Sequence, residues 1–243
     1  MSLLKKQEFP YVSLVTPTYN RRRFIPSLIR IVEQQTYPRD RMEWVIYDDG
    51  QEEVRDLFEA ASDRLPVIRF IHSEDKMTLG EKRNRLNEEA SGEIIVAMDD
   101  DDYYFPERVE VAVKTLLANP RVHLVGSSEV YMYFSDAKEI YKVGPYFPNH
   151  ATNGTMAWTN TYGKTHKYDE TVVYAEERSF LENYKNQLVQ LPPMKVMLVI
   201  SHSDNTFDKR DLRTAGNPLI VKTTLGLEDF IQDLSLREFF ASS

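Results

Sequence analysis

The chain has 243 residues, of which 42% are apolar and 12% aromatic, so it can bury a substantial core. Its net charge of −8 argues against a general binder of nucleic acid or anionic membrane, because both depend on clustered Lys and Arg. With no cysteine there is no disulfide and no thiolate metal site, which suits a reducing compartment. The start "MSLLKKQEFP" lacks the apolar stretch of a signal peptide, and no run approaches the roughly 18 apolar residues of a membrane span. We therefore expect a cytoplasmic protein without an integral membrane segment.

Short apolar runs alternate with amphipathic stretches in the first half of the chain. The periodicity predicts strands at 11–16, 43–49, 67–72 and 93–98, and helices at 24–35, 52–61, 80–90 and 106–120. Apolar strands separated by helices indicate a parallel sheet that is covered on both faces and joined by right-handed crossovers. The fold class predicted for this half is α/β.

The pattern changes after residue 120. Three strand-like runs follow one another too closely for crossover helices, which favours antiparallel pairing; they are 122–127, 129–134 and 138–143. Residues 144–168 look irregular, and we expect helices at 175–186 and 227–240 and a strand at 195–200. No internal repeat or linker divides the chain, so residues 1–243 are predicted to form one domain with a smaller antiparallel sheet in its second half.

Four consecutive carboxylates follow the predicted strand 93–98. They are Asp99, Asp100, Asp101 and Asp102. Like charges held together are unfavourable alone, but they suit a hard divalent cation, and ligands of an open parallel sheet bind beyond the carboxyl ends of its strands. A metal there could bridge the phosphates of a nucleotide. The alternative is a solvated acidic turn that caps the helix beginning near Pro106.

Two other predicted strands end in polar residues at the same edge, in "TPTYNRR" and "YDDG". Asp49 can accept from a base N–H or a ribose hydroxyl, Tyr19 offers a face for stacking, and Arg83 can reach a phosphate. Each also has an ordinary interpretation. Asp49 can cap a turn with Gly50, Tyr19 can be a packing residue, and Arg83 can belong to a solvated helix face.

The segments "VSLVTPTYN", "WVIYDDG" and "LGEKRN…ASGEIIVAMDDDDYYFPERV" together resemble the nucleotide-binding half of family 2 glycosyltransferases with the GT-A fold. The resemblance covers about residues 11–120 and leaves 121–243 as the acceptor-binding half. It implies a Rossmann-like, mostly parallel sheet flanked by helices, a nucleotide-sugar donor, and a divalent cation, Mn²⁺ or Mg²⁺.

The same resemblance assigns roles to individual residues. The family's Asp-X-Asp motif is matched by Asp99, Asp100 and Asp101, in which the first Asp faces the ribose or metal and the last binds the cation; Asp102 matches a further acidic position. The same resemblance implies that Pro17 and Tyr19 line the uracil pocket, that Asp49 contacts the base, and that Arg83 lies near the diphosphate.

Inverting members of the family carry an acidic pair near a helix start, and its second carboxylate is the general base. The match here is "YAEERSFLENY", which places Glu177 at the base position and Glu176 beside it. Glutamate replaces the usual aspartate, which leaves open which of the two side chains points inward. The alternative is a helix N-terminus that simply favours acidic residues.

Histidine 202 follows a predicted strand in "VISHSDNTFDKR". Some related chains carry a similar segment, and in several GT-A enzymes a late histidine completes the metal or diphosphate site. Imidazole is a suitable extra ligand for manganese, so His202 is a candidate metal ligand and Asn205 a candidate phosphate contact. A structural histidine is the alternative.

The segment 144–170 is rich in Tyr, Phe, Trp and small polar residues. Sugar C–H faces stack on aromatic rings, so this segment is a candidate acceptor-binding wall, with Trp158 as its first candidate and a buried core tryptophan as the alternative. The sequon Asn153-Gly154-Thr155 is interpreted as a loop, since no secretory signal accompanies it.

The predicted function is metal-dependent, inverting transfer of a sugar from a UDP-sugar to a hydroxyl of a glycan, glycoprotein, lipid or small molecule. Two alternatives from other classes remain open. One is a non-catalytic module that binds a nucleotide sugar or a cation. The other is a sugar-phosphate nucleotidylyltransferase, although "TPTYNRRR" lacks the glycine-rich loop that such an enzyme needs after its first strand.

Overall fold

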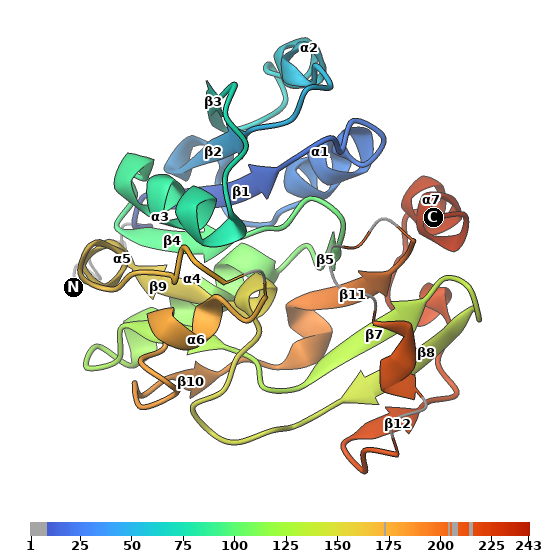
Figure 1. Cartoon of the computed structure of the whole chain (residues 1–243). Coiled ribbons are helices and arrows are strands. Elements are labelled where there is room, and N and C mark those ends of the chain that lie inside the picture. The colour runs from blue at the N-terminus through green and yellow to red at the C-terminus, as the bar shows by residue number, and fades with distance from the viewer. Residues whose placement is uncertain (1–8, 173, 204, 206–208, 214–215) are drawn as a thin grey trace, which may run out of the picture.

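The computed structural model describes residues 9–172, 174–203, 205, 209–213 and 216–243. It contains two sheets, which Figure 1 shows at the left and at the lower right. The strands of the larger sheet are β1 (Val12–Thr18), β2 (Met42–Asp48), β3 (Val67–His72), β4 (Ile94–Ala97), β6 (Leu124–Gly126), β9 (Ala157–Thr159) and β10 (Val189–Gln190). The strands of the smaller sheet are β5 (Tyr103–Tyr104), β7 (Val130–Phe134), β8 (Glu139–Val143), β11 (Met197–Ser201) and β12 (Ile220–Lys222). The helices are α1 (Ile25–Glu33), α2 (Arg55–Ala60), α3 (Leu79–Glu89), α4 (Arg108–Ala118), α5 (Asn160–Thr165), α6 (Glu177–Phe180) and α7 (Leu234–Ala241).

The larger sheet has the strand order β10-β6-β9-β4-β1-β2-β3 and is parallel except where β9 pairs with β4 and β6. Both of its faces are covered. Leu14 packs into a core with α1 and α4, whereas its neighbour Val15 packs into a second core with α3 and α5. Consecutive strand residues point to opposite faces, so a strand covered on both sides must be apolar throughout. This explains the unbroken apolar runs of the first half.

The smaller sheet has the order β12-β8-β7-β11-β5 and is antiparallel except between β7 and β11. The α/β class, the mostly parallel larger sheet and the smaller, mostly antiparallel sheet are therefore confirmed. No helix in the described part of the chain is both long enough and apolar enough to cross a membrane.

Several elements differ from the sequence-based expectations. The helix expected at 227–240 is divided into a short 3₁₀ helix at Leu227–Asp229 and the later α7, and the strands β5, β10 and β12 were not expected. The strand β6 joins the larger sheet between β9 and β10 instead of pairing with β7. The segment expected to be irregular contains β9 and α5. The helix expected at 175–186 is confined to α6, because three successive residues after it, Glu182, Asn183 and Tyr184, have φ values of 47°, 55° and 63° and cannot continue a right-handed helix.

Candidate active site

A cavity of about 550 Å³ opens beyond the carboxyl ends of β1 and β4. Its volume falls in the range of small-molecule sites, and its position is the one at which open α/β sheets bind ligands. Residues from both halves of the chain line it, among them Pro17, Tyr19, Arg21, Lys76, Lys82, Arg83, Asp99, Asp100, Asp101, Asp102, Glu176, Asn205 and Lys209.

The four consecutive carboxylates have different partners. Asp102 Oδ1 accepts a hydrogen bond from the Ile200 backbone N–H at 2.8 Å, which ties the run to β11. Arg21 contacts both middle carboxylates of the run. Its Nε lies 3.8 Å from Asp100 Oδ1 and its NH2 lies 3.5 Å from Asp101 Oδ2. The run is therefore divided among separate partners, which reduces the repulsion within it.

Ionisation differs along the run as well. Burial, followed by the charge of Asp101, raises the pKa of Asp100 to about 8, and the same two causes raise the pKa of Asp102. Burial also acts to raise the pKa of Asp101, but the hydrogen bond from His202 and the charges of Lys209 and Arg21 outweigh it and lower that pKa to about 2. Asp101 consequently holds a negative charge at neutral pH.

The carboxylate of Asp101 and the imidazole of His202 converge, with 3.3 Å between Oδ2 and Nε2. The His202 side chain is fully buried; its ring centroid lies 4.8 Å from that of Phe24, and its Nε2 lies 2.9 Å from Asn205 Nδ2. An oxygen and an imidazole nitrogen suit Mn²⁺, and Mg²⁺ commonly takes one or two carboxylates plus substrate phosphates. Within the described residues no group of three or more His, Asp or Glu is placed to hold a metal. The pair thus fits a cation that a bound diphosphate helps to ligate.

Arg83 connects the acidic run to the acidic pair. Its NH1 donates to Asp99 Oδ1 at 2.9 Å and its Nε donates to Glu176 Oε1 at 2.9 Å. Burial opposes the charge of Arg83, but Asp99 and Glu176 raise its pKa above the usual value. The side chain lines the cavity, as expected, yet its guanidinium is committed to two carboxylates.

Arg83 is positioned by the start of α3. The Thr78 side chain accepts from the Glu81 backbone N–H at 3.2 Å, and Glu81 Oε2 accepts from the Thr78 backbone N–H at 2.7 Å. This capping box fixes where the helix begins, at the cavity edge of the sheet. The spacing Thr-x-x-Glu was a signal in the sequence that could have located this terminus.

The two glutamates of the acidic pair occupy different surroundings. Glu176 is buried, lines the cavity and bonds Arg83, whereas Glu177 is half-buried and makes no ion pair with the described residues. Burial and then the charge of Glu176 raise the pKa of Glu177 to about 7. The preceding Ala175 has φ of 57°, so the backbone turns sharply just before the pair.

Of the three residues expected to contact the nucleotide base, two line the cavity and one does not. Pro17 and Tyr19 line the cavity, and Lys76 Nζ lies 4.2 Å from the centroid of the Tyr19 ring. Asp49 does not reach the cavity surface. Its fully buried carboxylate accepts from Lys82 Nζ and from the Met77 backbone N–H, both at 2.7 Å. Both oxygens therefore bond to the protein itself and neither faces a nucleotide base.

Sequence reasoning missed the cationic residues that line the cavity beside Arg83, namely Arg21, Lys76, Lys82 and Lys209. Arg21 belongs to the basic "NRRR" and Lys82 to a helix rich in charge, and both look like solvated residues in the sequence. Lys82 Nζ also donates to the Thr18 carbonyl oxygen at 3.1 Å. The burial that distinguishes Arg21 and Lys82 comes from tertiary packing, which a local pattern does not contain.

The expectation that Trp158 forms an acceptor wall is wrong. The side chain is 2% exposed, its Nε1 donates to Asn87 Oδ1 at 3.1 Å, and its ring lies 5.1 Å from that of Phe180. It belongs to β9, which lies between β4 and β6 and is covered by the second core. The sequon Asn153-Gly154-Thr155 is likewise buried, in a short 3₁₀ helix.

Solved structures with this architecture are GT-A glycosyltransferases. Residues 1–349 of TarS from Staphylococcus aureus, in complex with UDP-GlcNAc, match with a TM-score of 0.63 and 18% identity over 81% of this chain and 60% of that one. A mannosyltransferase from Pyrobaculum calidifontis, in complex with GDP-Man and Mn²⁺, matches with a TM-score of 0.65 and 17% identity over 82% of this chain and 59% of that one. The fold is therefore GT-A.

The sequence places the chain more narrowly. A family profile described as glycosyl transferase family 2 matches residues 13–189, and the chain belongs to that family. An uncharacterized glycosyltransferase of Methanocaldococcus jannaschii is 25% identical over 195 residues, which are 73% of this chain and 66% of the relative. One from Haemophilus influenzae is 29% identical over 114 residues, which are 47% of this chain and 37% of the relative. The chain thus spans well under half of the latter.

Proposed function

We propose that this chain transfers a sugar from a UDP-sugar to an acceptor hydroxyl with inversion at the anomeric carbon, and that Mn²⁺ or Mg²⁺ takes part. The observation that carries the proposal is the bridge through Arg83, which joins Asp99 of the acidic run to Glu176 of the acidic pair. It brings a candidate leaving-group site and the first glutamate of the acidic pair into one cavity, although 93 residues separate Arg83 from Glu176. The proposed base Glu177 follows that glutamate directly and is not itself among the described residues that line the cavity.

The donor is proposed to lie in the half formed by residues 11–120. Tyr19 and Pro17 offer a flat apolar surface for the base, and the cations of Arg21, Lys76 and Lys82 line the same cavity. A diphosphate placed among these cations and above the acidic run would gain charge-assisted hydrogen bonds. The nucleotide sugars held by the TarS and mannosyltransferase structures support this class of donor.

The cation would be held by Asp101 and His202, with Asp99 nearby. When bound, it supplies positive charge that stabilises the departing diphosphate. The protein itself contributes Arg21 at 3.5 Å from Asp101, which keeps positive charge at the leaving-group side of the cavity. Arg83 keeps Asp99 in place through two hydrogen bonds, at 2.9 and 3.3 Å.

Glu177 is proposed to be the general base. The acceptor oxygen attacks the anomeric carbon from the side opposite the diphosphate, its proton passes to the Glu177 carboxylate, and the sugar–phosphate bond breaks to release UDP. A base is most effective when its pKa lies near the working pH, and the pKa of Glu177 is raised to about 7. Glu176 is less suited because its carboxylate already accepts from Arg83.

The test is release of UDP from a panel of UDP-sugars, without acceptor and with added Mn²⁺, before and after chelation. We expect slow hydrolysis of at least one donor and its loss on chelation. Metal-independent release would remove the cation from the proposal. If no donor in the panel releases UDP although UDP binding is detected by calorimetry, the chain is a binding module and the proposed transfer is wrong.

A further inference from the structure

Four aromatic side chains form a cluster on the surface near α6, here called the aromatic patch: Tyr146, Phe147, His150 and Tyr184. His150 is at its centre, with its ring centroid 4.7 Å from Tyr146, 5.3 Å from Phe147 and 5.2 Å from Tyr184, onto which it stacks at 26°. The edge of Phe147 meets Tyr184 at 5.1 Å. None of these rings lines the donor cavity, and the proposed transfer has so far assigned them no role.

The aromatic patch combines open ring surface with unsatisfied polar groups. Phe147 is 47% exposed and Tyr146 is 39% exposed, and His150 and Tyr184 are half-buried. Neither tyrosine hydroxyl makes a hydrogen bond to the described residues, and the buried Nδ1 of His150 has no partner among them. Ring faces beside tyrosine hydroxyls that bond none of the described residues suit a polyhydroxylated ring better than an apolar protein face.

The backbone beneath the aromatic patch is fixed by side chains. Gln190 Nε2 donates to the carbonyl oxygens of Pro148, at 2.7 Å, and His150, at 3.0 Å, and its Oε1 accepts from the Ser128 N–H at 2.7 Å. Such anchoring holds the loop 146–150 against β10, so the rings are arranged before a ligand arrives.

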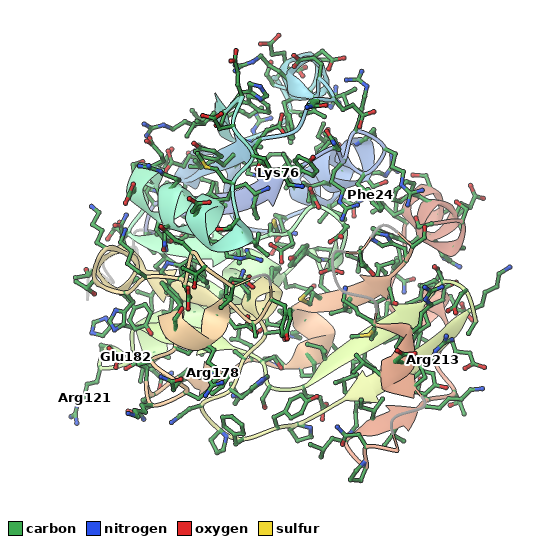
Figure 2. All side chains as sticks on the ribbon, viewed as in Figure 1. Phe24, Lys76, Arg121, Arg178, Glu182 and Arg213 are labelled. Carbon is green, nitrogen blue, oxygen red and sulfur yellow. The ribbon has the colours of Figure 1, made fainter. Side chains whose placement is uncertain are left out.

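Tyr184 is placed by the left-handed turn after α6. Arg178 Nε donates to Asn183 Oδ1 at 3.0 Å across this turn, whose residues 182–184 all have positive φ. Figure 2 labels Arg178 and Glu182 at the lower left, beside α6. Positive φ is unfavourable for residues other than glycine, and it is retained here in the turn that follows α6.

The aromatic patch is also close to the proposed base. Tyr184 follows Glu177 by seven residues. The Leu181 N–H donates to the Glu177 carbonyl oxygen at 2.9 Å and the Asn183 N–H donates to the Arg178 carbonyl oxygen at 2.8 Å, which keeps the segment between them compact. Burial and then the charge of Glu177 raise the pKa of Tyr184. Glu176 faces the donor cavity, and α6 leads directly from the pair to the turn carrying Tyr184.

We propose that the aromatic patch is the acceptor subsite and that it binds a pyranose ring of a glycan acceptor by stacking. This inference rests on the proposed function, since it assigns the acceptor of the same reaction. It replaces Trp158, whose ring is enclosed in the core, with rings that a ligand can reach.

The experiment uses the full chain, saturated with UDP and Mn²⁺, and a panel of methyl glycopyranosides of the common hexoses and N-acetylhexosamines. Saturation-transfer NMR detects weak contacts between protein and the C–H faces of these sugars. We expect at least one glycoside to give a signal, and Phe147→Ala and Tyr184→Ala each to weaken its binding about tenfold, the amount expected for loss of a stacking ring.

Phe9→Ala is the matched control. Phe9 is also 47% exposed and meets another tyrosine, Tyr37, edge-on at 5.4 Å, but it belongs to no part of the site. It should leave glycoside binding unchanged. UDP affinity, measured on the same samples, shows whether each variant is folded.

Three results would overturn the inference: no glycoside contacts the wild-type chain, both patch variants bind glycosides as well as Phe9→Ala does, or the patch variants alter oligomeric state without altering glycoside binding. The last would identify the aromatic patch as a protein interface. UDP release by the wild-type chain is recorded separately. Its absence would refute the proposed transfer, whereas patch-dependent glycoside binding is read directly by NMR.

Discussion

At the scale of single residues, neighbouring carboxylates in this chain differ because their partners differ. Asp101 stays ionised beside His202, whereas Asp100 and Asp102 have raised pKa values. Glu176 is paired with Arg83 and Glu177 is not. The sequence identified both acidic groups, but it could not assign roles within them, because the partners come from segments far away in the chain.

Asp101→Asn should weaken Mn²⁺-dependent binding of a UDP-sugar by about tenfold or more, because it removes the ionised ligand while keeping the volume of the side chain. Calorimetry with and without Mn²⁺ measures the change. Asp56→Asn is the control, since Asp56 is an exposed carboxylate paired with Arg22 away from the cavity. An unchanged manganese dependence in Asp101→Asn would remove Asp101 from the cation site.

Glu177→Gln should keep UDP and metal binding but lose transfer by about 10²-fold or more, because an amide cannot take the acceptor proton. Glu176→Gln should retain more activity and should instead lower the free energy of unfolding by about 1–3 kcal/mol, because Arg83 loses the charge of a buried partner. Turnover and thermal unfolding of both variants separate the roles. If transfer is lost only in Glu176→Gln, the base is Glu176.

The pH dependence follows from the raised pKa of Glu177. The base must be ionised, so transfer should fall as pH drops through about 7. Charge on Glu177 is disfavoured in the folded state by burial and by Glu176, and Arg83 only partly offsets this. Glu177→Gln should therefore raise the free energy of unfolding above pH 7, and this gain should vanish below the usual value of 4.5, where the residue is protonated whether folded or not. A gain independent of pH would contradict the assignment.

At the scale of elements, the sequence predicted long periodic segments well and short segments poorly. Apart from the two-residue β5, the helices and strands up to α4 lie close to their expected ranges, because their turns or alternations show a period. β9 has three residues and owes its existence to pairing with β4 and β6, which no local pattern reveals. α6 ends early at a left-handed turn that contains no glycine, so the sequence gives no local signal of the helix end.

Thr78→Ala tests the element that delivers Arg83 to the cavity. Loss of the capping hydrogen bond should lower the free energy of unfolding by about 0.5–2 kcal/mol, as for other N-cap substitutions. Chemical denaturation measures it. Ser62→Ala is the control, since the Ser62 hydroxyl bonds the Glu59 carbonyl oxygen at an exposed helix end, and it should change stability by less than about 0.5 kcal/mol. Equal effects would show that the capping box does not stabilise α3.

At the scale of the whole molecule, segments from the first and the second half of the chain meet at one buried arginine. The resemblance predicted the GT-A fold correctly, and it named Arg83, Asp99 and Glu176 separately. It could not predict that one guanidinium binds both carboxylates, since that contact joins α3 to the residue before α6. The link forms only when α6 has packed beside α3 in the second core.

A double-mutant cycle on Arg83 and Glu176 measures this link. Arg83→Lys keeps the charge, but an ammonium cannot present the fixed fork that reaches Asp99 and Glu176 together. Because Arg83→Lys and Glu176→Gln remove the same contact, their effects on the free energy of unfolding should be non-additive by about 0.5–3 kcal/mol. Arg83→Lys combined with Asp56→Asn should be additive within about 0.5 kcal/mol, since Asp56 contacts Arg22 and not Arg83. If the effects of Arg83→Lys and Glu176→Gln are also additive, the bridge does not couple the two halves of the chain. The main observation behind the proposal of one active site shared by both halves would then be lost.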